Sequence, residues 1–219
     1  MIDFKLLTTK DRTGLISNIG TDGFLLYCYL VGNQSLYESN YVSVKQIQRT
    51  FYNQIKDARS IVKYIDLLHK NNIITIKEDI SGSTRIGIKS IIEYTIDKPK
   101  QFLTIPISLF LNEIEVIGSV GFAILTLFSK MHNNSFGGIG SGGFSNPSVD
   151  YIADVIGINR KTVFKYIGLL EKQKLLKVEK QGMIQYENEY GNITYRNESN
   201  HYFVQHIVNP NCKYYIERK

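Results

Sequence analysis

Basic side chains cluster in the second half of the chain, where residues 159–180 hold seven basic residues against two acidic ones. Guanidinium and ammonium groups pair with guanine edges and phosphates, and a threonine can reach a phosphate or a thymine methyl. One aromatic side chain stands among them. The candidate residues are Arg160, Lys161, Thr162, Phe164 and Lys165.

A helix over residues 160–173 would position these side chains. Val163, Ile167 and Leu170 recur at helical spacing and form the predicted core face, so the basic residues lie on the opposite face. Asn159 is the predicted N-cap of this helix, and Gly157 suits the end of a preceding helix over 149–156.

An internal repeat organises the whole sequence. Residues 59–76 match residues 161–178 at a constant offset of 102, and a motif KYI at Lys63 recurs at Lys165. Upstream, Phe4 and Phe24 match Phe102 and Phe122 at an offset of 98. We therefore expect two copies of one unit, residues 1–97 and 98–219, with a four-residue loop insertion in the second.

The same elements are expected in each copy. A short strand comes first, at residues 4–7 and 102–107, and a buried apolar helix follows, at 24–31 and 121–131. Two closely spaced helices come next, at 43–51 and 57–71 in copy one. A β-hairpin ends each copy, from strands at 73–78 and 85–96, and from strands at 175–180 and 193–204.

This order resembles winged helix-turn-helix proteins. Residues 147–178 are similar to the pattern of bacterial winged-helix regulators, in which I-A-x-x-x-G precedes T-V-x-x-x-I-x-x-L. The tandem arrangement also resembles replication initiators of plasmids and phages. The resemblance implies an α+β fold of two tandem winged helix-turn-helix domains, each with a helical core and a small antiparallel hairpin wing.

The two copies differ in charge. Residues 159–180 carry +5, whereas residues 57–79 are neutral, with Asp66 on the outward side of their helix. Because phosphate neutralisation supplies most non-specific affinity for DNA, we expect copy two to read DNA. Copy one either makes a weaker contact through Arg59, Ser60 and Lys63 or mediates dimerisation.

The two hairpins and the C-terminal tail each allow two interpretations of their function. Arg85 in copy one, and Lys180 and Arg196 in copy two, are candidate DNA contacts if the hairpins act as wings. The hairpins could equally be exposed elements that only pack on their helices. Residues 209–219 are either a basic arm or a segment that docks on a partner.

The remaining signals predict no enzyme, no metal and no cofactor. The four histidines and Cys28 and Cys212 show no ligand spacing. The G-x-G-x-x-G of residues 138–143 lacks its strand and helix context, so we interpret residues 137–143 as a loop. The longest apolar stretch, 116–128, is too short to span a membrane, and no secretory signal is visible, which predicts a cytoplasmic protein.

We therefore expect a sequence-specific double-stranded DNA-binding protein. Replication initiation or copy control, and transcription regulation, in a plasmid, phage or other mobile element, are the two roles that the resemblance implies. A homodimer and the replication or transcription machinery are the further partners expected. The alternative is a protein-interaction module that uses winged-helix domains for dimerisation and binds DNA only generically.

Overall fold

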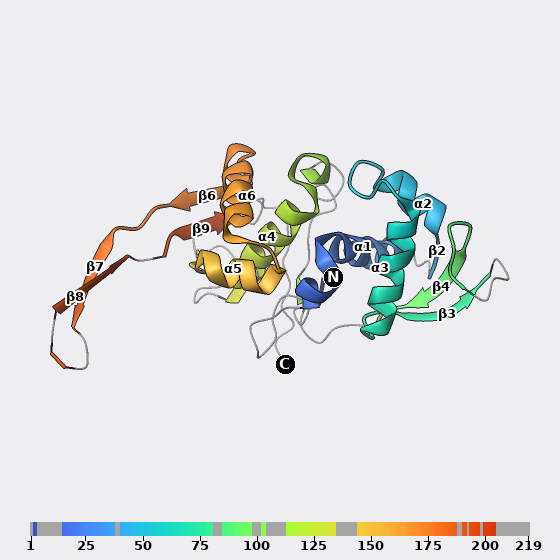
Figure 1. Ribbon diagram of the computed structural model, residues 1–219, viewed down its shortest axis with the longest axis horizontal. Coiled ribbons are helices and arrows are strands. Elements are labelled where there is room, and N and C mark those ends of the chain that lie inside the picture. The colour runs from blue at the N-terminus through green and yellow to red at the C-terminus, as the bar shows by residue number, and fades with distance from the viewer. Residues whose placement is uncertain are drawn as a thin grey trace.

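The protein has an α+β fold in which helices carry the core and all strand pairs are antiparallel, as shown by a computed structural model (Figure 1). The α+β class expected from the sequence is confirmed. The structure describes residues 2–3, 15–37, 40–80, 85–97, 102–103, 113–134, 144–187, 190–191, 193–197 and 199–204.

Copy one contains three helices and a three-stranded sheet among its described residues. The helices are α1 (Leu15–Tyr37), α2 (Val44–Thr50) and α3 (Ala58–Lys70). The strands are β1 (Ile2–Asp3), β2 (Tyr41–Ser43), β3 (Thr75–Asp79) and β4 (Ile91–Thr95), of which the last three form a sheet in the order β2-β4-β3. The sequence did not predict β2, which pairs with the return strand of the hairpin.

Copy two repeats the helices and extends the hairpin. It contains β5 (Phe102–Leu103), α4 (Ile114–Asn134), α5 (Val149–Ile156) and α6 (Arg160–Lys172). Its hairpin has two paired parts, β6 (Leu176–Glu179) with β9 (His201–Val204), and beyond them β7 (Met183–Glu187) with β8 (Ile193–Asn197). The single return strand expected over 193–204 is therefore wrong, because the structure divides it into two strands that pair with different partners.

The offset between the copies has a different origin from the one predicted. Residues 135–148, fourteen in all, separate α4 from α5, against the six residues 38–43 between α1 and α2. The turn between α5 and α6 spans only 157–159, whereas 51–57 separate α2 from α3. A longer connection after the first helix and a shorter turn before the third together give the net difference of four. The strand expected at 4–7 lies outside the described residues, and the strand expected at 102–107 is described only at 102–103.

Two apolar helices at the centre bury most of the core. In α4 all ten residues from 121 to 130 are buried, and in α1 seven of the eight residues predicted at 24–31 are buried. Because α4 is longer than the apolar stretch seen in the sequence, residues Ile114–Met131 are long and apolar enough to cross a membrane by length and composition. Two thirds of that window is buried inside the protein, so packing accounts for its apolar character.

The two copies pack on each other around a local twofold axis. Phe24 of α1 contacts Phe122 of α4, with ring centroids 6.0 Å apart, and the Thr21 and Ser119 hydroxyls are 3.2 Å apart. Both pairs join positions that the repeat makes equivalent, at the offset of 98. Contacts between equivalent residues place them at the axis that relates the two copies, and reciprocal contacts identify that axis as twofold, as in isologous interfaces.

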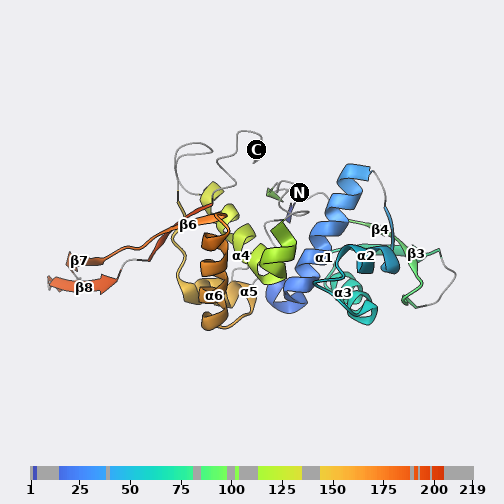
Figure 2. The same cartoon turned by 90° about the horizontal axis from the view of Figure 1, so that it is seen from above.

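Contacts away from the axis are reciprocal, as this symmetry requires. The turn after α2 reaches the start of α4, where the Gln54 side-chain amide donates to the Ile114 carbonyl (3.4 Å). Gly157, after α5, lies correspondingly against Ser17 near the start of α1. Strands β1 and β5 pair across the same axis, Ile2 with Leu103 and Asp3 with Phe102. Figure 2 shows α1 and α4 next to each other at the centre of the molecule.

Each copy also attaches its third helix to its first through a glycine. Gly23 in α1 and Gly121 in α4 are equivalent, and the rings of Tyr64 in α3 and Tyr166 in α6 lie against them. A Cβ at Gly121 would lie 2.9 Å from Ile117 Cβ and 3.2 Å from Tyr166 Cδ1. The missing side chain therefore sets how closely α6 approaches α4.

We predict that Gly121→Ala lowers the free energy of unfolding by about 1–3 kcal/mol, because overpacking of a filled core costs that much. Urea denaturation followed by circular dichroism measures it. The matched control is Gly168→Ala on α6, where a Cβ would have no atom within 4 Å. That change should stabilise the helix by about 0.5–1 kcal/mol. Equal effects of the two substitutions would contradict the packing account.

Candidate nucleic-acid interface

Helix α6 begins and is oriented as the sequence predicts. Asn159 caps it, because its Oδ1 accepts the Thr162 N–H at 2.8 Å. Gly157 ends α5 in the left-handed conformation (φ 78°, ψ 37°), which a residue with a side chain adopts only with strain. Val163, Ile167 and Leu170 are buried, which confirms the predicted core face.

The opposite face of α6 presents basic and aromatic groups to solvent. Arg160, Lys161, Lys165 and Gly168 are exposed, and Phe164 is 55% exposed, a high fraction for a phenylalanine. The structure thus brings the predicted α6 residues together on one exposed face, with Thr162 half-buried at its edge.

Several of these side chains interact with neighbouring groups. Arg160 Nε lies 3.1 Å from Asp150 Oδ1 on α5, and both side chains are mostly exposed. Lys165 Nζ lies 5.6 Å from the centre of the Tyr166 ring. The Thr162 hydroxyl donates to Asn159 Oδ1 at 3.0 Å, so it takes part in the helix cap. Lys161 has no ion-pair partner among the described residues.

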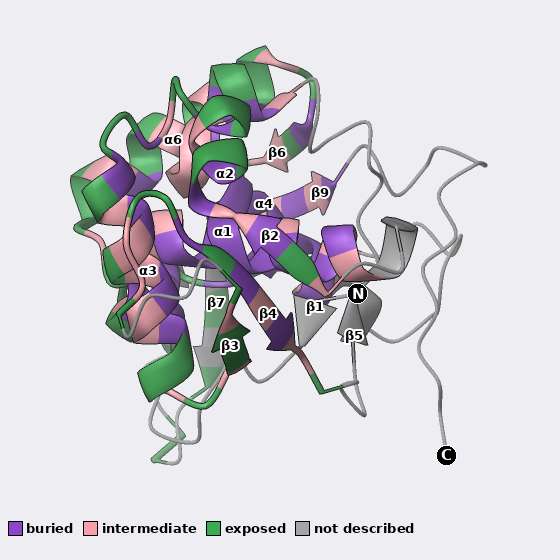
Figure 3. Cartoon of the chain, turned by 90° about the vertical axis from the view of Figure 1, so that its right-hand side faces the viewer, coloured by how far each residue is buried: buried purple, intermediate pink, exposed green. Residues whose placement is uncertain are grey.

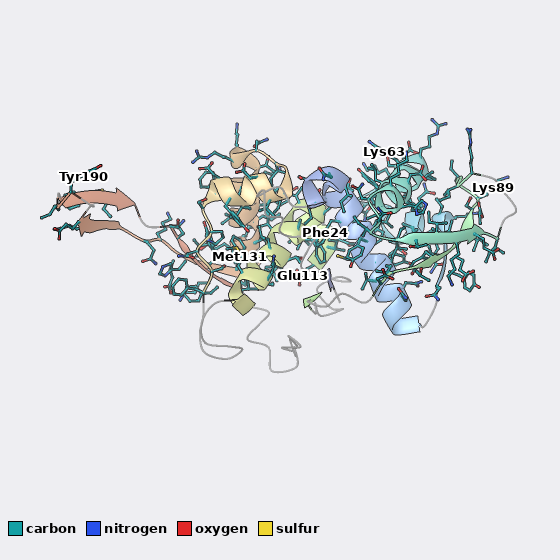
Figure 4. The ribbon with its side chains drawn as sticks, turned by 90° about the horizontal axis from the view of Figure 1, so that it is seen from below. Phe24, Lys63, Lys89, Glu113, Met131 and Tyr190 are labelled. Atoms are coloured by element: carbon teal, nitrogen blue, oxygen red, sulfur yellow. The ribbon has the colours of Figure 1, made fainter. Side chains whose placement is uncertain are left out.

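Helix α3 is the counterpart of α6 in copy one. Asp57 caps it by accepting the Arg59 N–H at 2.9 Å, and Ile61, Ile65 and Leu68 are buried. Arg59 and Lys63 are exposed, at the positions equivalent to Lys161 and Lys165. Figure 4 shows Lys63 pointing away from the body of the protein. Ser60 is half-buried, and so is Asp66, which helical spacing places on the side of Arg59 and Lys63.

The two helices lie on the same side of the molecule. In Figure 1 α3 and α6 face the viewer, and in Figures 2 and 3 both lie on the side opposite the small β1–β5 ribbon. Each packs on the first helix of its own copy, α3 on α1 and α6 on α4. The twofold contact of α1 with α4 therefore places both exposed helical faces on one surface of the protein.

Positive charge is shared equally once the neighbouring helices are counted. Helix α2 packs on α3 and α5 packs on α6, so each belongs to the surface of its copy. From α2 through β3, residues 44–79 hold seven basic and four acidic residues; from α5 to residue 180, residues 149–180 hold the same numbers. Both segments carry +3. The asymmetry that the sequence predicted depended on starting the count at the third helix.

Three basic residues that the sequence analysis missed account for this result. Lys45 and Arg49 on α2, and Lys56 in the turn before α3, are all exposed. Copy two has Asp150 and Asp154 on α5 instead, and carries its extra positive charge on Lys174, Lys177 and Lys180 after α6. A count over the complete pair of helices would have found them from the sequence.

The predicted wing residues lie off the two helices. Lys180 is exposed between β6 and β7, and Arg85 is exposed before β4. Arg196 lies on β8, and its side chain is outside the described part of the chain. Two other basic residues of the hairpins are paired, Lys77 with Glu93 at 3.1 Å and Lys177 with Glu179 at 2.7 Å. The loop 137–143 and the tail 209–219 lie outside the described residues.

Cys28 and His201, whose side chains could react or bind a metal, are packed within the fold. Burial in α1 raises the pKa of the Cys28 thiol, which keeps it protonated and poorly reactive. Within the described ranges, no group of three or more His, Cys, Asp or Glu side chains is arranged to hold a metal ion. The His201 ring stacks on Phe144, with ring centroids 3.7 Å apart.

Comparison of the chain with protein-family models, with curated proteins and with solved structures gives no match.

We predict that Asn159→Ala lowers the free energy of unfolding by about 1 kcal/mol, because the first turn of α6 loses its capping acceptor. Asn159→Asp should keep most of the stability, since a carboxylate accepts the same hydrogen bond and suits a helix N-terminus. Urea denaturation of the three proteins checks both statements. Equal destabilisation by the two substitutions would contradict a capping role.

Proposed function

We propose that the protein is a non-enzymatic, sequence-specific binder of double-stranded DNA, built from two winged helix-turn-helix units. The observation that carries the proposal is the pair of equivalent helices, α3 and α6, whose basic outer faces lie on one side of the molecule. In each unit α2 or α5 would be the first helix of the helix-turn-helix, α3 or α6 the recognition helix, and the following hairpin the wing.

The chemistry of the two faces suits a major groove. A groove about 12 Å wide admits one helix, whose outward side chains then reach base edges and flanking phosphates. Lys161 and Lys165 on α6, and Arg59 and Lys63 on α3, occupy the two outward turns that would face the DNA. Gly168 leaves room for close approach, whereas Asp66 at the equivalent position of α3 would favour a cytosine amino group over a phosphate.

The twofold relation between the units sets the layout of the target. Two helices related by a twofold axis enter a duplex in opposite directions, which corresponds to an inverted repeat. In a homodimer the half-sites are identical, but here one chain supplies both helices and their side chains differ. We therefore propose an imperfect inverted repeat as the target of a single chain. Replication or copy control, or transcription regulation, remains the proposed role.

Matched charge reversals test the proposal and the equal sharing of charge between the copies. We expect K161E/K165E and R59E/K63E each to weaken binding by about 100-fold or more, because one base contact is worth about 1–3 kcal/mol. Fluorescence anisotropy measures this on duplexes tiled across the DNA around the protein's own gene, beside a scrambled control. The two variants change the same number of charges at equivalent exposed positions, so each controls the other for net charge.

Three outcomes separate the alternatives. Loss in both variants, with a salt slope of about −0.9 per phosphate contact, supports binding by both units. Loss of DNA binding in K161E/K165E alone would support the asymmetric hypothesis, in which copy two reads the DNA. Weak, salt-erased binding to all duplexes would contradict the proposal and favour a protein-interaction module.

A further inference from the structure

The two hairpins end at opposite extremes of the molecule, and their ends carry complementary surfaces. Figure 4 labels a residue at each extreme, Tyr190 at the end of the copy-two hairpin and Lys89 at the end of the copy-one hairpin. We call the first the distal ribbon, formed by β7, β8 and the turn at Tyr190, and the second the basic tip, residues 80 and 85–91.

The distal ribbon exposes an apolar and acidic face. Strand alternation and the register of β7 with β8 place alternate residues on one face, and three of these are exposed hydrophobic side chains. They are Met183, Ile193 and Tyr195. Glu187 is exposed on the same face, opposite Ile193. Tyr190 at the turn is 82% exposed.

The basic tip exposes isoleucines beside positive charge. The Ile80 N–H donates to the Ile91 carbonyl at 2.9 Å, so these two residues stand opposite each other at the end of the hairpin. Ile80, Ile88 and Ile91 are each between 42% and 51% exposed. Lys89 is exposed among them, and no residue of the described chain forms an ion pair with it. Residues 80–91 contain two basic residues and no acidic one, and the adjoining Asp79 accepts a hydrogen bond from the Ser90 hydroxyl of the tip.

These surfaces carry apolar side chains and opposite charges, but they cannot meet within one molecule. They lie at opposite ends of the long axis, with both helical units between them (Figures 1 and 4). A two-stranded ribbon is also marginally stable by itself, so an apolar covering on the distal ribbon would stabilise it. DNA is the less suitable occupant of this face, because Glu187 would repel phosphates.

We propose that the distal ribbon of one chain docks on the basic tip of a second copy, in a head-to-tail contact. Such a contact joins two different patches and leaves one of each free, so it continues from copy to copy rather than closing a pair. Chains bound at neighbouring DNA sites would be linked in a row. The contact itself needs no DNA, so it stands or fails separately from the proposed function.

A charge swap tests the contact. Sedimentation velocity of the full chain without DNA, at concentrations up to the order of 100 µM, should show association that rises with concentration. E187K and K89E should each abolish it, since each places like charges opposite each other. The double variant E187K/K89E should restore it, because the pair is then reversed. Both residues are exposed, so neither substitution should disturb folding, which circular dichroism verifies.

The matched control is K174E. It reverses the charge of an exposed lysine that lies away from both hairpin ends, and it should leave association unchanged. A native chain that stays monomeric over the whole range would overturn the proposal. Association that persists in both single variants would overturn it too. If K89E weakens DNA binding but leaves self-association intact, the basic tip is a DNA-binding wing and not a docking surface.

Discussion

The packing of α1 against α4 is the contact on which the rest of the structure depends. Phe24 meets Phe122 and Thr21 meets Ser119, each residue facing its own equivalent in the other copy. Because both helices are apolar on nearly every side, neither could remain exposed, and each covers the other while also carrying its own third helix. One interface therefore fixes both the hydrophobic core and the relative placement of the two units.

That interface explains why the candidate binding surface exists as one surface. Helices α3 and α6 do not need to contact each other to keep a fixed relative position, because each packs on the first helix of its own copy. Gly23 and Gly121 set the distance at each attachment, where the rings of Tyr64 and Tyr166 lie against the backbone. The geometry presented to a ligand thus follows from contacts buried at the centre of the protein.

Local features of the fold could be predicted from the sequence, because they depend on neighbouring residues. The Asn159 cap, the Gly157 helix end and the buried face of Val163, Ile167 and Leu170 are of this kind. The twofold axis could not be predicted, since it arises from packing between residues 98 positions apart. Strand β2 was also missed, because its partner β4 lies far along the chain. Strand β7 was missed although its partner β8 is the next strand, because the sequence analysis took the return arm of the hairpin as one strand. The charge of copy one was underestimated, because the count began at the third helix and left out Lys45 and Arg49 on α2, which a count over both helices includes.

The most direct test of the central claim is the layout of the DNA that one chain selects. Repeated selection of the native protein on random-sequence duplexes, followed by native mass spectrometry of the selected complex, gives both the site and the stoichiometry. The twofold relation of α3 and α6 predicts two unlike half-sites in inverted orientation, with one chain per duplex. Half-sites in direct orientation, or a single half-site bound by one helix, would contradict it.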